Sequence, residues 1–194
     1  MNRLSIALAV VLLAGALAAA QAPPKRVGIG SPATPEQIAA LDIDVRPDGA
    51  GLPPGGGTAR EGAAVYAQKC AACHGTNGEG GTADPLVGAE PSETAPFGPE
   101  YEHWRNGRPD VPFTIGNYWP YATTIFDYVR RAMPASAPGT LTADETYALT
   151  AWVLARNGIV ADTATMNAET LPRVRMPARA RFVRDDRKGG SEVR

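Results

Sequence analysis

The sequence predicts an all-α fold with three main helices and long irregular arms at both ends. Two segments begin with Thr and carry Glu three residues later, which is the pattern of a helix-capping box. Three segments also repeat apolar residues at helical spacing. The arms are predicted by composition, because 21 Gly and 18 Pro among 194 residues are many for a compact domain. This length suits one globular core.

The first residues predict a signal peptide over residues 1–20. Arg3 precedes an uncharged apolar run at residues 4–13, and small residues at alternate positions follow. We therefore expect export to the periplasm. The alternative is an uncleaved membrane anchor, for which the apolar run is short; no later stretch is expected to span a membrane. The net charge of -1 gives no electrostatic reason to expect nucleic acid as a partner.

Residues 21–57 are rich in Pro, Gly and Ala and predict an extended N-terminal arm. One short helix is expected there, in TPEQIAALDI, where Thr34 can cap the helix and Pro35 suits its first position. PDGAGLPPGGG, residues 47–57, has no periodic pattern and is expected to be a linker.

A compact domain is expected over residues 58–160. The capping boxes are Thr58 with Glu61 and Thr142 with Glu145. The three helices are expected at residues 59–70, 122–134 and 141–159, with the second stopped by Pro134. Residues 75–120 hold many Gly and Pro and are expected to be mostly loop. Residues 161–194 carry 8 Lys or Arg against 5 Asp or Glu and predict a solvated basic arm.

The end of the first helix carries the most specific motif, KCAACHGTNGEGG at residues 69–81. Cys70 and Cys73 are the two cysteines of the chain, and His74 follows at once. C-x-x-C-H is the attachment motif of c-type haem. Thiols three residues apart can each add to one vinyl group of the porphyrin, and the adjacent histidine can supply a nitrogen ligand to the iron. We therefore expect one covalently attached haem c.

Three other interpretations of the motif are weaker. A zinc site could use both cysteines, His74 and His103, but zinc sites usually take ligands from two compact pairs. A thioredoxin-like redox pair is expected between a strand and a βαβ pattern, and neither is visible. A structural disulfide between Cys70 and Cys73 would close a very small loop and would leave the histidine unexplained.

The second axial ligand decides what the haem can do. The candidates are His103, Met133, Met166 and Met176. Met133 is favoured, because it ends a helix and precedes Pro134; a methionine in the core is the alternative. With His74 and Met133 both bound, the iron has no open position and the protein transfers single electrons, at a potential that methionine ligation raises. If Met133 does not bind, the alternative is a haem enzyme or a gas sensor. A haem-bearing docking subunit is compatible with electron transfer.

Residues 58–160 resemble a class I cytochrome c. In that family the helix that ends in the haem motif packs across the last helix. The resemblance implies that Gly62 and Tyr66 on the first helix contact the last helix, with Trp152 as a partner. It also implies that Pro85 and Leu86 belong to the haem site, with the Pro85 carbonyl accepting a hydrogen bond from the ligand histidine.

A larger part of the chain, residues 28–187, resembles the cytochrome subunit of periplasmic sulfite and sulfane dehydrogenases, including those of Sox sulfur oxidation. The segments that carry this resemblance are GIGSPATPEQIAALDIDVRPDGAGLPPGGG, TIGNYWPYATTIFDYVRRAMP and LPRVRMP. The resemblance implies a molybdenum-cofactor protein as electron donor and a respiratory acceptor downstream. Residues 91–112 are long and charged and do not match this pattern well.

Overall fold

The structure is a computed structural model that describes residues 29–88 and 113–182. The predicted signal peptide at residues 1–20 and the charged segment at residues 91–112 therefore lie outside the described residues, as does His103. The chain divides into two units, one ending at Leu41 and the other beginning at Asp42. In the described parts of both units, no helix is long and apolar enough to cross a membrane.

The first unit contains the short helix that the sequence predicts. Helix α2 spans Pro35–Leu41. The Thr34 N–H donates to Gln37 Oε1 at 2.9 Å, and the Gln37 N–H donates to Thr34 Oγ1 at 3.2 Å, so Thr34 caps the helix. None of its residues is buried.

The second unit contains the three predicted helices. They are α3 (Ala59–Lys69), α7 (Ala122–Ala132) and α8 (Ala143–Arg156). Both predicted capping boxes are present, at Thr58 with Glu61 and at Thr142 with Glu145. Two short helices, α4 (Ala71–His74) and α6 (Ile115–Tyr118), are added to this set. The mostly helical class predicted from the sequence is confirmed.

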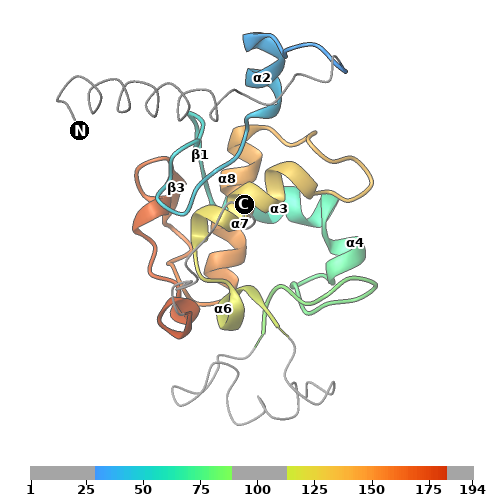
Figure 1. The fold of residues 1–194 in the computed structure, drawn as a ribbon. Coiled ribbons are helices and arrows are strands. Elements are labelled where there is room, and N and C mark those ends of the chain that lie inside the picture. Colours follow the sequence, from blue (N-terminus) through green and yellow to red (C-terminus); the bar gives the residue numbers. More distant parts are fainter. Residues whose placement is uncertain (1–28, 89–112, 183–194) are drawn as a thin grey trace, which may run out of the picture. The chain divides into compact units, whose positions relative to one another are not determined.

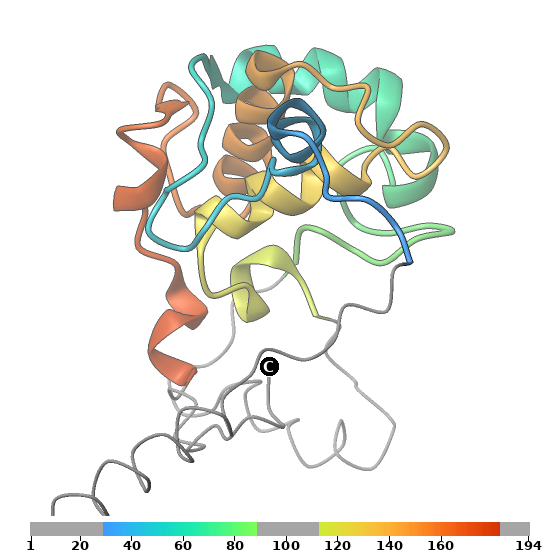
Figure 2. The same ribbon diagram turned by 45° about the horizontal axis from the view of Figure 1, so that its top comes forward.

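Helices α3 and α8 pack closely against each other (Figures 1 and 2). A Cβ on Gly62 would lie 2.0 Å from the Ala148 carbonyl oxygen, so only glycine allows this approach. One turn later the rings of Tyr66 and Trp152 stack with their centroids 3.7 Å apart. The contact that the cytochrome resemblance implies is therefore confirmed.

A two-stranded antiparallel sheet joins the segment before α3 to the segment after α8. Strand β1 (Gly56–Thr58) pairs with β3 (Thr165–Asn167), with Gly57 opposite Met166 (Figure 1). Two 3-10 helices follow, η1 (Leu171–Arg173) and η2 (Pro177–Arg181).

The segment that contains β3, η1 and η2 differs from the solvated arm that the sequence predicts. Met166, Leu171, Met176 and Ala178 are all buried in the core. Their apolar side chains are too irregularly spaced to show a helical or strand period, but each one reaches the core. The residues before β1 pack similarly, because Val45 is buried and the Tyr147 hydroxyl donates to the Pro53 carbonyl at 2.8 Å.

Candidate haem site

The haem-attachment motif lies where α3 ends and α4 begins. Cys70 closes α3, since its N–H donates to the Tyr66 carbonyl at 2.9 Å. Within α4 the N–H groups of Cys73 and His74 both donate to the Cys70 carbonyl, at 3.1 and 3.0 Å. One helical turn therefore carries both thiols and the imidazole. Gly75 ends this turn at a φ of 82°, a conformation that favours glycine.

Both cysteines are free thiols in this turn. Cys70 is partly buried, and burial raises the pKa of its thiol to about 11, so this side chain is kept as a neutral thiol. The structure thus gives no disulfide between Cys70 and Cys73 and leaves both sulfur atoms available for thioether bonds.

The orientation of His74 is fixed through its Nδ1 atom. Nδ1 lies 2.8 Å from the Asp84 carbonyl oxygen. A carbonyl oxygen can only accept, so Nδ1 carries the proton and the Nε2 lone pair is free to bind a metal. The sequence resemblance assigned the acceptor to the carbonyl of Pro85. The structure corrects this by one residue, because the chain turns so that the peptide before the proline faces the imidazole.

The loop that supplies this carbonyl is held by several backbone contacts. The Ala83 N–H donates to the Cys73 carbonyl at 3.0 Å, and the Leu86 N–H donates to the Gly78 carbonyl at 2.8 Å. The Tyr66 hydroxyl donates to the Gly75 carbonyl at 2.8 Å. Burial raises the pKa of Tyr66 to about 12, so the hydroxyl keeps the proton that it donates.

Asn157 is a supporting residue that the sequence did not reveal. Its Nδ2 atom donates to the Leu86 carbonyl at 3.0 Å and to the Val153 carbonyl at 2.9 Å. The Ile115 N–H donates to the same Leu86 carbonyl at 3.1 Å. These bonds tie the histidine-supporting loop to the end of α8 and to the start of α6. In the sequence, Asn157 followed by Gly158 indicated only the end of a helix.

Met133 occupies the position directly after α7. Its backbone is extended (φ -119°, ψ 152°), and its N–H donates to the Val129 carbonyl at 3.1 Å. The side chain is half-buried. In both ribbon views, α4 and the segment that follows α7 lie on the same side of the second unit (Figures 1 and 2). Met166 and Met176, the other methionines considered as ligands, are buried in the core.

The residues around the motif fit a haem. One imidazole with a free Nε2 and two free thiols on one turn are the donor set that covalent haem attachment needs. Within the described ranges, no three His, Cys, Asp or Glu residues are grouped to hold a metal ion by themselves. A haem iron does not need such a group, because the porphyrin supplies four of its ligands. Two apolar residues of the motif and its loop, Ala71 and Leu86, pack on the core without being fully buried, as expected beside a flat apolar group.

This fold and motif define a c-type cytochrome. The family model described as cytochrome C oxidase, cbb3-type, subunit III matches residues 57–153, and the chain belongs to this cytochrome c family. Family membership implies haem c as the cofactor and electron transfer as the class of function.

The chain is also similar to one chain in the crystal structure of the sulfane dehydrogenase SoxCD from Paracoccus pantotrophus. The two share 41% sequence identity with a TM-score of 0.68, over 83% of this chain and 73% of that chain. No curated protein matches the chain.

Proposed function

We propose that this chain is a periplasmic mono-haem cytochrome c that accepts single electrons from a molybdenum-containing sulfite or sulfane dehydrogenase and passes them to the respiratory chain. Cys70 and Cys73 hold the haem covalently, and His74 and Met133 are the axial ligands. When bound, the haem supplies one-electron redox chemistry; the protein orients the imidazole through Asp84 and supplies the apolar surroundings.

The observation that carries the choice of partner is the extent of the structural likeness. The family model matches half of the chain, residues 57–153. The likeness to the sulfane dehydrogenase chain covers 83%, so it extends beyond the haem domain into the flanking segments. A generic electron carrier needs only the haem domain, whereas shared flanking segments favour a shared kind of assembly.

The assignment of Met133 separates electron transfer from the alternative of a haem enzyme or gas sensor. A thioether on the iron raises the potential and excludes exogenous ligands. We expect ferrous Met133→Ala to bind carbon monoxide readily and to have a lower midpoint potential than the wild type. Met176→Leu is the control, since it keeps the volume of a buried methionine and should leave the haem spectrum unchanged. Fast carbon monoxide binding by the wild type would refute the assignment and favour the enzyme or sensor.

The attachment and the partner need separate measurements. Mass spectrometry of the mature protein should show the chain plus one haem, and Cys70→Ala with Cys73→Ala should lose that increment. The ferric protein should then be mixed with a molybdenum-cofactor sulfite or sulfane dehydrogenase and its substrate, and haem reduction followed. Substrate without the dehydrogenase is the control. An unreduced haem in the complete mixture, with a haem that dithionite does reduce, would reject this partner and leave the cytochrome assignment intact.

A further inference from the structure

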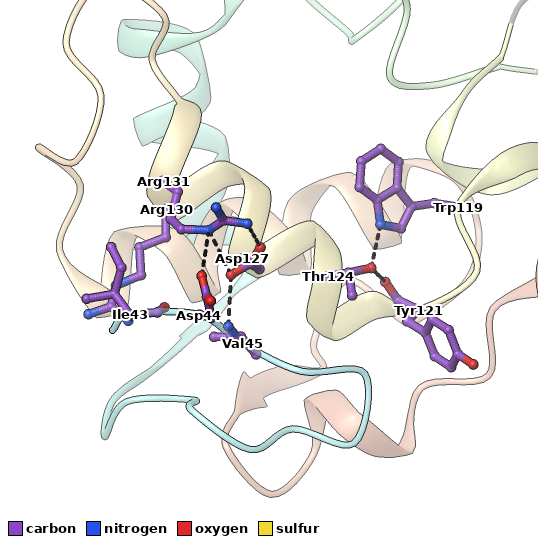
Figure 3. A network of polar contacts seen from close by, with 9 residues as sticks. All are labelled: Ile43, Asp44, Val45, Trp119, Tyr121, Thr124, Asp127, Arg130 and Arg131. Carbon is purple, nitrogen blue, oxygen red and sulfur yellow. Dashed lines mark hydrogen bonds and ion pairs between the residues drawn. The ribbon is translucent and has the colours of Figure 1, made fainter. Parts of the chain in front are cut away.

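A buried carboxylate on α7 binds the first residues of the second unit. The Asp127 side chain is 12% exposed, and its Oδ1 accepts the Val45 N–H at 2.8 Å and Arg131 Nε at 3.0 Å. A second guanidinium nitrogen of Arg131 pairs with the other carboxylate oxygen, Oδ2 (Figure 3). Two-point contact between a guanidinium and a carboxylate is a strongly directional ion pair.

The same arginine extends this network to a second carboxylate. Arg131 Nε lies 3.6 Å from Asp44 Oδ1, and Arg130 Nη1 donates to the Ile43 carbonyl at 3.4 Å (Figure 3). Residues 43–45 are therefore held by the second half of α7. Burial works against ionisation of Asp127, but the hydrogen bonds from Arg131 and Val45 outweigh it and lower the pKa of Asp127. We call Asp44, Val45, Asp127 and Arg131 the α7 clamp.

The α7 clamp acts on the turn of helix that ends at Met133. Arg131 is two residues before Met133, and the Met133 N–H closes the last turn of α7 on Val129. A ligand must be held within about 0.5 Å of its productive position. Even a small rotation of this turn would therefore matter, because it would displace the Met133 thioether.

The other end of α7 is fixed by a separate set of bonds. Trp119 Nε1 donates to Thr124 Oγ1 at 2.8 Å, and Thr124 Oγ1 donates to the Tyr121 carbonyl at 2.9 Å (Figure 3). The two networks share no residue. The chain therefore offers a matched control, in which α7 is loosened at the end away from Met133.

We propose that Asp127 and Arg131 are positioning residues for Met133, the sixth ligand of the haem iron. Through the α7 clamp, the binding of Met133 to the iron depends on the docking of residues 43–45 on α7. This inference rests on the proposed assignment of Met133. It also gives the N-terminal arm a role beyond packing, because anything that pulls residues 43–45 away from α7 releases the turn that carries the ligand.

The test compares three variants of the full haem protein. Asp127→Asn keeps the side-chain volume but removes the charge. The two-point contact with Arg131 is then lost, and the Val45 N–H donates to a neutral oxygen, which is a weaker acceptor than a carboxylate. We expect ferrous Asp127→Asn to bind carbon monoxide about tenfold faster than the wild type, because binding scales with the population in which Met133 has left the iron. Arg131→Lys keeps the charge without the two-point contact and should show a smaller increase. Thr124→Val, at the other end of α7, should bind at the wild-type rate.

Two further readouts separate positioning from general destabilisation. Amide hydrogen exchange at Val45 should accelerate in Asp127→Asn and not in Thr124→Val, and the midpoint potential should fall only in the clamp variants. Wild-type rates in Asp127→Asn, alongside fast binding in Met133→Ala, would overturn this inference and leave the proposed function standing. Slow binding in Met133→Ala would remove the ligand assignment and this inference with it. An equal increase in the rate of carbon monoxide binding in Asp127→Asn and Thr124→Val would also overturn the inference, because the effect would then be one of stability alone.

Discussion

At the scale of single residues, the orientation of His74 depends on the loop that supplies its hydrogen-bond acceptor. The imidazole is oriented by the Asp84 carbonyl, and the loop containing it is tied down through the Leu86 carbonyl by Asn157. Asn157 is 7% exposed, and in the described part of the chain its Oδ1 is the one buried side-chain polar atom without a hydrogen-bond partner. Both donor hydrogens are used, so the residue serves here as a donor.

Asn157→Asp tests that donor role. The side chain keeps its shape, but both bonds are lost and a carboxylate is placed against two carbonyl oxygens. We expect a loss of about 3 kcal/mol in the free energy of unfolding at neutral pH, the cost of a buried charged group without a partner. The measurement is chemical denaturation of the haem protein, with hydrogen exchange at Ile115 as a local readout.

Asn167→Asp is the matched control for this change. Asn167 Oδ1 accepts the N–H groups of Glu169 and Thr170, both at 2.9 Å, and Asp retains these acceptor roles. The control should stay within about 0.5 kcal/mol of the wild type, as for a substitution that removes no such interaction. Equal losses in the two variants would show that the donor bonds of Asn157 carry no special weight.

At the scale of helices, the sequence was most informative where the relevant signal was local. Capping boxes and apolar spacing predicted α3, α7 and α8, because both signals lie within the helix they describe. Strands β1 and β3 were missed. Each has three residues, and each is stabilised by a partner more than 100 positions away along the chain, which no local pattern records.

At Gly62, where α3 crosses α8, close packing and helix propensity predict opposite effects of an alanine substitution on stability. Replacing glycine by alanine in an exposed helix position stabilises by about 1 kcal/mol. At Gly62 the new methyl group would lie 2.0 Å from the Ala148 carbonyl oxygen and 2.8 Å from Trp152 Cβ. We expect Gly62→Ala to destabilise instead, by about 2–3 kcal/mol, because the two helices must move apart.

Ala63→Gly measures the propensity term in the same helix. Ala63 is exposed on α3, so this change should cost about 1 kcal/mol with no packing contribution. Thermal unfolding followed by circular dichroism gives both values. A stabilised Gly62→Ala protein would contradict the close approach of the helices, and would also weaken the Tyr66–Trp152 stack as an explanation of how α3 is held.

At the scale of the whole molecule, the haem-attachment motif could be found in the sequence, but the contacts that surround it could not. Cys70, Cys73 and His74 are adjacent in sequence, so their spacing alone indicates haem attachment. The Asp84 carbonyl and the α7 clamp depend on the path of the loop and of residues 43–45 through space. A backbone acceptor leaves no trace in residue type, and an Asp–Arg pair at i, i+4 on a helix is common on solvated surfaces.

The last prediction concerns how much of the chain belongs to the cooperative core. The sequence predicted that the domain ends near residue 160, yet Leu171 in η1 is fully buried and η1 packs against α7.

If the described C-terminal segment unfolds together with the helices, Leu171→Ala should cost about 2–5 kcal/mol, the usual loss for truncating a buried leucine. Ile38→Ala on α2 is the control, because Ile38 is 53% exposed and its loss should change stability by less than about 0.5 kcal/mol. Chemical denaturation of both variants, followed by haem absorbance and by far-ultraviolet circular dichroism, gives the two values. Coincident transitions in Leu171→Ala, shifted to lower denaturant, would place η1 in the same folding unit as the haem site. A Leu171→Ala protein as stable as Ile38→Ala would instead mean that this segment detaches without disturbing the helices, and that the core ends where the periodic pattern ends.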